Sequence, residues 1–277
     1  MLPDWIGIPH CKLYAAYSSK RSFSMQEAKE VTGKPKKLLR KILSELGKRG
    51  LLVSVDGGYY LPDFEGFCLG VKLRDELEGI DPEEKLRRAE SEYLIVGSYA
   101  AFLYHEYQFP SRHRIKVKRE DYGLWYNLLD FKIDPSLTGQ EYENRRELDG
   151  LSVAPPERVF VEGVAKGSAD SILDSVSLAL SVDIDWDEVV KLAMEKGVER
   201  EVGALLRILN QRSKSRIAPR KTIDELRSQV KKIGRAKEFP RNVLVQERTF
   251  SEWGKKWHLE LTLPRYVIEK PIEELMP

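Results

Sequence analysis

The basic residues between Lys34 and Lys48 are the part of the sequence whose types and spacing most clearly indicate chemistry. Positive charge recurs through this stretch at Lys34, Lys36, Lys37, Arg40, Lys41 and Lys48. Apolar residues recur between them at helical spacing, at Leu38, Leu39, Ile42, Leu43 and Leu46. A helix with one basic face attracts phosphate groups and fits the major groove of DNA. The stretch therefore predicts a double-stranded DNA contact.

Lysine and arginine side chains are predicted to have different roles in such a contact. Lysine is a point charge, so Lys37 and its neighbours set affinity and salt dependence. Arg40 can pair bidentately with guanine and is the best candidate for sequence readout. The alternative is a solvated helix face on a unit that docks protein. We favour DNA because the charge is so one-sided.

Local signals indicate how this helix is positioned. Ser24 and Glu27 have the spacing of a capping box, which predicts a short helix ending at Thr32-Gly33. Pro35 suits the first turn of the basic helix, and Gly50 suits its end. The segment from Trp5 to Tyr17 predicts a further helix packing beneath them.

A hairpin follows the basic helix in the sequence. Residues 51–55 and 59–61 predict two strands joined by a tight turn at Asp56-Gly57-Gly58. Helix, turn, basic helix and hairpin form the order of a winged helix-turn-helix, here residues 1–62. In that arrangement Gly57, Gly58 and Tyr59 place the wing on the adjacent groove or backbone.

Composition bounds the class of protein. Eleven Lys/Arg stand against four Asp/Glu between His10 and Pro62, a net of +7 within a chain of net +2. Charged residues make up 32% of the chain, which hints at a thermophilic source. The two cysteines, Cys11 and Cys68, lack zinc spacing, so we expect buried free thiols and no metal or cofactor. No apolar run is long enough to span a bilayer and no signal peptide is apparent, so we expect a cytoplasmic protein.

A second set of basic residues follows a strand, the pair Gly97-Ser98 and a helix. This order of elements is typical of nucleotidyltransferase cores. Such an enzyme needs two carboxylates at alternate positions on the next strand to hold divalent metal. The strand expected at residues 111–119 instead carries Arg112, Arg114, Lys116 and Lys118. These residues cannot chelate magnesium, so we expect no catalysis. They form either a possible second polyanion-binding strand or a solvated edge strand.

The remaining segments complete an α+β prediction. Residues 63–212 are expected to form a larger α+β domain with a degenerate nucleotidyltransferase-like core and a helical subdomain. That subdomain comprises three apolar or amphipathic segments, at residues 171–180, 183–197 and 199–209, with Asp183 or Asp185 as a cap. Residues 213–277 are expected to form a linker, a helix and a strand, with a tail from Glu269 to Pro277. The segment 67–77 is ambiguous between strand and helix.

In this order of parts the sequence resembles the AbiEi-type antitoxins, which are predicted transcriptional regulators of viral-defence systems. The resemblance rests on three pieces across most of residues 10–210: the winged helix ending GLLVSVDGGYYLPD, the segment Gly97-Ser98-Tyr99-Ala100-Ala101 with its basic strand, and Pro156-Glu157-Arg158 leading to DWDEVVKLA. It implies an antitoxin-like autorepressor paired with a nucleotidyltransferase-like toxin. The long spacers between the second and third pieces depart from the family pattern.

We therefore expect a DNA-binding transcriptional regulator of a toxin-antitoxin or defence operon. A homodimer is expected because winged-helix regulators usually pair two half-sites. Two alternatives remain open: a nucleotidyltransferase-fold enzyme using Gly97-Ser98, and a protein-binding module without specific DNA readout.

Overall fold

The structure is a computed structural model. It describes residues 2–17, 22–55, 58–88, 91–107, 110, 113–128, 131–230, 236–239 and 251–276. The fold is α+β, as expected, and divides into two compact units that are described separately. Unit 1 comprises residues 1–94, 115–143 and 149–151, and unit 2 comprises residues 95–114, 144–148 and 152–277. The domain boundaries expected at residues 62 and 212 stay predictions.

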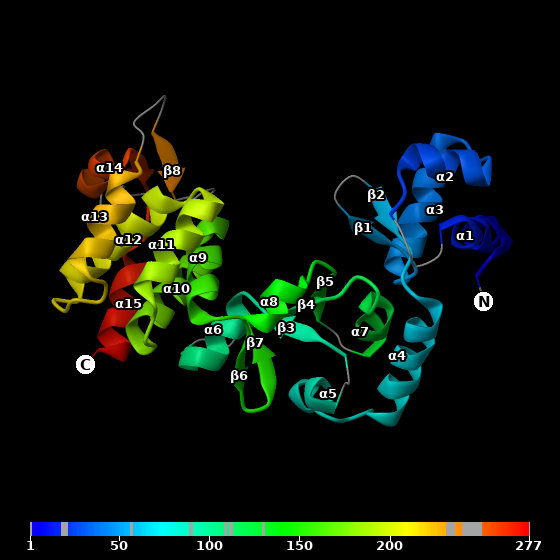
Figure 1. The fold of residues 1–277 in the computed structure, drawn as a ribbon, viewed down its shortest axis with the longest axis horizontal. Helices are drawn as coiled ribbons and strands as arrows, with labels where there is room; N and C mark the ends of the chain where they lie inside the picture. Colours follow the sequence, from blue (N-terminus) through cyan, green and yellow to red (C-terminus); the bar gives the residue numbers. More distant parts are fainter. Residues whose placement is uncertain are drawn as a thin grey trace. The chain divides into compact units, whose positions relative to one another are not determined.

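Unit 1 begins with the helices and hairpin that the sequence predicts (Figure 1). Their bounds are α1 Asp4–Tyr17, α2 Met25–Thr32, α3 Lys36–Lys48, β1 Val53–Val55 and β2 Gly58–Tyr60. The capping box of α2 is present, since the Ser24 hydroxyl accepts from the backbone of Glu27 and the Glu27 carboxylate accepts from the backbone of Ser24. The two strands pair antiparallel, so the hairpin is confirmed, but Gly58, expected in the turn, is the first residue of β2. Residues 56–57 lie outside the described residues.

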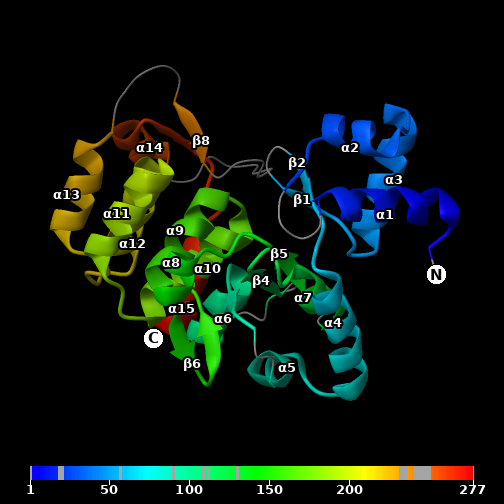
Figure 2. The same cartoon turned by 45° about the vertical axis from the view of Figure 1, so that its right-hand side comes forward.

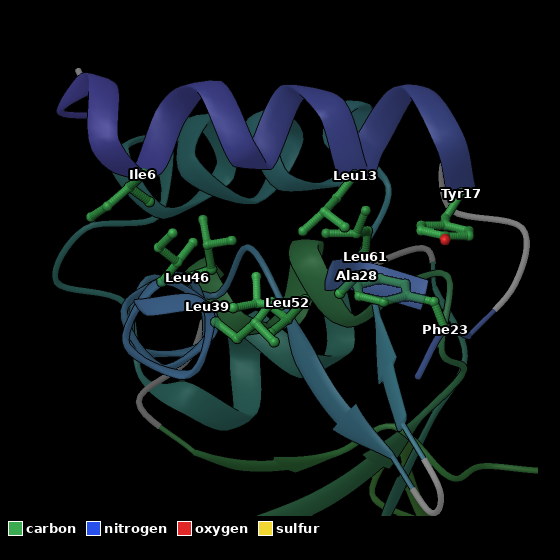
Figure 3. Packing of buried hydrophobic residues seen from close by; sticks show 11 residues of the cluster. Ile6, Leu13, Tyr17, Phe23, Ala28, Leu39, Leu46, Leu52 and Leu61 are labelled. Carbon is green, nitrogen blue, oxygen red and sulfur yellow. The ribbon is translucent and has the colours of Figure 1, made fainter. Parts of the chain in front are cut away.

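One hydrophobic cluster holds these elements together (Figure 3). Helix α1 contributes Ile6, Leu13 and Tyr17, and the Tyr17 ring stacks on the ring of Phe23 with a centroid distance of 4.7 Å. The α3 side chains Leu39, Ile42, Leu43 and Leu46 are all buried. Burying a side chain of this size stabilises the fold by roughly 1.5–3 kcal/mol, so this face fixes how α3 is rotated. Its opposite face is therefore set toward solvent.

The rest of unit 1 is built around α4 (Phe64–Glu76) and α7 (Tyr122–Leu128), which pack side by side (Figure 2). The ambiguous segment 67–77 is thus mostly helical. Gly70 allows the close approach, because a Cβ there would meet the backbone of Leu124. Two short helices complete the unit, α5 Pro82–Arg88 and α8 Gly139–Glu143.

A five-stranded mixed sheet has the strand order β5-β4-β3-β7-β6. The strands are β3 Tyr93–Ile95, β4 Arg114–Val117, β5 Lys132–Asp134, β6 Arg146–Leu148 and β7 Leu151–Val153. Strand β4 lies between two neighbours, so the edge-strand interpretation of this segment is wrong. Its residues alternate, with Ile115 and Val117 buried and Arg114 and Lys116 half-buried.

Unit 2 is mainly helical, and α10 is its centre, packing against α6, α9 and α15. The helices are α6 Ser98–His105, α9 Pro156–Lys166, α10 Ala169–Ser181, α11 Trp186–Lys196, α12 Glu199–Arg212 and α13 Arg220–Ser228. The predicted helical segments at residues 171–209 are confirmed. Asp185 caps α11, as one of the two expected candidates, by accepting from the backbone of Asp187 and Glu188.

The C-terminal part corrects two expectations. Residues beyond Glu269 do not form a tail, since α15 (Arg265–Leu275) buries Val267, Ile268 and Pro271. It follows β8 (Lys237–Phe239), α14 (Ser251–Trp257) and β9 (Leu259–Leu261), with β8 and β9 pairing parallel. Cys11 and Cys68 are exposed free thiols, and burial was wrongly expected. Among the described helices, none has the length and apolar character that crossing a bilayer requires.

Candidate nucleic-acid interface

Helix α3 presents its bases on the face opposite the core. Leu39, Ile42, Leu43 and Leu46 are turned inward, while Lys36, Lys37, Arg40, Lys41 and Lys48 are exposed. Leu38, which the sequence assigned to the apolar stripe, lies at the edge of that stripe and is 37% exposed. The core thus orients the basic residues of α3 into solvent.

The first turn of α3 is electrostatically unfavourable as it stands. Pro35 is the N-cap and supplies no side-chain hydrogen bond, and no acidic residue lies in the first turn. Lys36 and Lys37 therefore add positive charge at the positive end of the helix dipole, where acidic side chains are favoured. Backbone N–H groups at such an end bind anions well. A bound phosphate would relieve both the repulsion and the missing cap.

The basic side chains of α3 and of the turn before it differ in their surroundings. Lys34 lies before α3, half-buried, in the turn that follows α2. Lys41 Nζ lies 5.2 Å above the ring centroid of Trp5 on α1. Lys48 Nζ pairs with Glu45 Oε1 at 2.8 Å, so part of its charge is compensated. Lys36, Lys37 and Arg40 form the exposed part of the surface nearest the helix start.

The hairpin next to α3 is held by Phe23. The backbone groups of Phe23 and Tyr59 exchange two hydrogen bonds of 2.8 Å, and their rings lie 5.9 Å apart. A Cβ at Gly58 would lie 2.5 Å from the Phe23 carbonyl oxygen, so glycine is required there for backbone packing. Tyr59 is half-buried by the same contact. Gly57 lies outside the described residues.

The C-terminal end of α3 is tied to α7. The Tyr126 hydroxyl donates to the Lys48 carbonyl oxygen at 2.8 Å. The ring of Tyr126 fills the space where a Gly50 side chain would stand, and Gly50 has a left-handed φ of 69°. Tyr126, which lies outside the first 62 residues, thus fixes the end of α3 in two ways. No local pattern in the sequence predicts this partner.

The bases on and after β4 have a different environment. Lys116 Nζ pairs with Glu141 Oε1 at 2.8 Å, and both side chains are only 13% exposed. Glu141 is itself fixed at the start of α8, where its carboxylate accepts from the Thr138 backbone. Lys118 pairs with Glu92 at 2.8 Å, and this contact raises the pKa of Lys118. Arg112 lies outside the described residues.

These ion pairs give the β4 lysines structural partners within unit 1. Arg114, at the start of the strand, is half-buried. The largely buried Lys116 pair leaves little charge to attract a polyanion, and Glu92 offsets part of the charge of the more exposed Lys118. We therefore leave Arg114, Lys116 and Lys118 out of the candidate interface.

The Gly97-Ser98 turn is unsuited to phosphate. Gly97 has φ 66° and ψ −144°, a backbone conformation that glycine adopts readily. The Ser98 side chain, however, is hydrogen-bonded to Asp174 of α10. Burial raises the pKa of Asp174 to about 6, and the Ser98 hydrogen bond acts in the opposite direction. The carboxylate that is present at neutral pH disfavours a phosphate here.

No group of three or more His, Cys, Asp or Glu side chains that could hold a metal ion occurs in the described part of the chain. Comparisons with protein-family models, with curated proteins and with solved structures found no match. The candidate interface therefore rests on the geometry of α3 and its surroundings.

Proposed function

We propose that this protein is a double-stranded DNA-binding transcriptional regulator. In this proposal residues 1–62 form a winged helix, α3 enters the major groove, and the β1–β2 hairpin lies along the adjacent backbone. The lysines at the start of α3 contact phosphates, and Arg40 reads a base edge. The expected antitoxin-like role, the toxin partner and the homodimer belong to the same proposal.

The observation that carries the proposal is the first turn of α3. Exposed Lys36 and Lys37 stand at a helix end that has no side-chain cap and no acidic residue. Repulsion from the helix dipole makes this arrangement costly in the free protein, by roughly 0.3–1 kcal/mol for each charge. A polyanion reverses the sign of that interaction. A merely solvated helix face has no need of bases at this particular end.

The enzyme alternative is weaker. A nucleotidyltransferase core requires carboxylates that hold metal beside the glycine turn. Lys116 and Lys118 occupy the next strand and the residue after it, and the acid beside the turn, Asp174, is bonded to Ser98. Transfer of a labelled nucleotide to RNA that is abolished in Ser98→Ala would support the enzyme instead.

Sequence-specific binding to the DNA upstream of the protein's own gene tests the proposal. That duplex and a scrambled duplex of equal length are titrated by fluorescence anisotropy at several salt concentrations. We expect tighter binding to the upstream duplex, with log Kd rising linearly with log salt concentration on both duplexes.

Equal affinity for the two duplexes would reduce the surface to a non-specific polyanion binder and contradict a regulator. Complete absence of binding would favour the protein-docking alternative. Arg40→Ala separates the two contributions, because loss of base readout brings the affinities for the two duplexes closer together.

A further inference from the structure

Unit 2 contains a cavity that the proposed DNA contact does not use. Its volume is about 420 Å³, toward the lower end of the roughly 300–1,000 Å³ found for small-molecule sites. It is formed by residues at the start of β6, the start of α9 and the first turns of α11. All of these residues belong to unit 2. The Pro156-Glu157-Arg158 and Asp185–Ala193 stretches singled out in the sequence thus meet at one cavity.

Two acids of the cavity wall hold the wall together. Glu157 is 4% exposed, and its Oε1 accepts from the Asp185 backbone at 3.0 Å. Asp185 Oδ1 in turn accepts from the backbone N–H groups of Asp187 and Glu188 at 3.0 and 3.2 Å. These bonds join the start of α9 to the start of α11. The wall is therefore rigid, and part of its negative charge is already satisfied by N–H groups.

The part of the lining contributed by the start of β6 is suited to an anion. Arg145 and Arg146 line the cavity from the start of β6, and Arg146 is exposed. Helix α9 also begins here, at Pro155-Pro156, without a side-chain cap, and the buried Glu157 in its first turn offsets part of the positive end of its dipole. Paired guanidinium groups bind phosphate through charge-assisted, bidentate hydrogen bonds.

The part of the lining contributed by α11 carries carboxylates that can accept hydrogen bonds. Glu188 lines the cavity from α11, and its carboxylate is hydrogen-bonded at 3.1 Å to Lys191, which lines the cavity as well. Asp185 also lines this part, and its cap uses only Oδ1. Carboxylates accept several hydrogen bonds at once and bind hydroxyl or amino groups. A ligand with an anionic end and a donor-bearing end matches this division.

We propose that the cavity binds a small organic phosphate that carries hydroxyl or amino donors. The phosphate contacts Arg145, Arg146 and the start of α9, and the donors face Asp185 and Glu188. A sugar phosphate and a nucleoside monophosphate share this chemistry and fit a cavity of this size. The site is independent of the α3 surface and does not rest on the proposed function.

Isothermal titration calorimetry of the full chain tests the site with ribose 5-phosphate, adenosine 5′-monophosphate, adenosine and inorganic phosphate. We expect ribose 5-phosphate or the nucleotide to bind at least tenfold more tightly than phosphate or adenosine alone. Binding of both organic phosphates would show that the sugar suffices, and binding of the nucleotide alone would show that the base is required.

Two variants locate the binding. Arg146→Glu should weaken the tighter organic phosphate by at least tenfold, and Arg145→Gln should also weaken it. Lys221→Glu is the matched control, because it changes charge equally at an exposed position of α13 in the same unit. Circular dichroism melts confirm that each variant is folded.

Absence of heat from every probe at millimolar concentration would overturn the proposal. The same holds if Arg146→Glu and Lys221→Glu bind alike, or if inorganic phosphate binds as tightly as the organic phosphates.

Discussion

Helix α3 and strand β4 both belong to segments with closely spaced basic residues, but the surroundings of these residues differ. On α3 the bases near the helix start are exposed and crowd a dipole end that repels them. Beside β4, Lys116 and Lys118 reach carboxylates 2.8 Å away, and the Lys116 pair is largely buried. A run of bases therefore indicates a polyanion contact only where the fold leaves the charge without internal compensation.

The largest effect that would sharpen this comparison is on stability. Lys116→Ala removes the lysine partner of Glu141 in a largely buried site, and breaking a buried pair costs about 3–5 kcal/mol. Since the pair is 13% exposed, we expect a loss of about 3 kcal/mol in urea unfolding. Lys37→Ala, the matched change on α3, should alter stability by less than about 0.5 kcal/mol. Equal losses would erase the distinction between the two regions.

Arg40→Ala should have its main effect on DNA. Removing a bidentate base contact costs about 1–3 kcal/mol on the preferred duplex and relaxes sequence preference. Anisotropy titrations of upstream and scrambled duplexes measure the change. Lys118→Ala, the control from the segment after β4, should leave both affinities as they are. A larger loss in Lys118→Ala than in Arg40→Ala would exchange the roles of the two regions.

A pH effect tests the Gly97-Ser98 turn. Burial raises the pKa of Asp174 to about 6, so its protonated form stabilises the fold below pH 4, and this contribution is lost as pH rises through 6. Asp174→Asn keeps the shape without the charge. It should be more stable than wild type at pH 8 by about 1–2 kcal/mol, with the gap closing near pH 4. A gap that is independent of pH would show that Asp174 carries no penalty for its charge.

The variant with the smallest expected effect should stabilise the fold and weaken DNA binding. Lys37→Glu places an acid in the first turn of α3, which should raise the free energy of unfolding by about 0.5 kcal/mol while weakening DNA binding. Thermal melts at low salt, where the dipole interaction is strongest, provide the measurement. A decrease in stability would show that the first turn of α3 is not under electrostatic strain.

Local chemistry explains why the first 62 residues were predictable. The Ser24 and Glu27 capping box, the apolar stripe of α3 and the antiparallel pairing of β1 with β2 each depend on residues close in sequence. Periodicity and caps therefore predicted these elements closely. Contacts between distant residues were not predicted even in this part of the chain. Glycine is required at position 58 because the backbone of Phe23, which is distant in sequence, approaches it closely.

Features formed by distant residues could not be predicted. Glu141 lies 25 residues from its partner Lys116, and Tyr126 lies 78 residues from Lys48. Trp5, at the start of the first helix, is 41% exposed and lies beside Lys41. The exposure of Cys11 and the burial of Val267 likewise depend on packing rather than on residue type. Only the folded structure shows which basic side chains have a carboxylate partner.

We propose that the exposed basic face of α3 is the DNA contact. Two double charge reversals, compared by fluorescence anisotropy on one upstream duplex, test this proposal. Lys37→Glu/Arg40→Glu removes charge from α3, and Lys255→Glu/Lys256→Glu removes equal charge from exposed positions of α14. We predict that the α3 variant loses affinity by at least about a hundredfold at physiological salt and that the α14 variant stays within about threefold of wild type. Equal losses in the two variants, or an α3 variant that binds as wild type does, would contradict the claim.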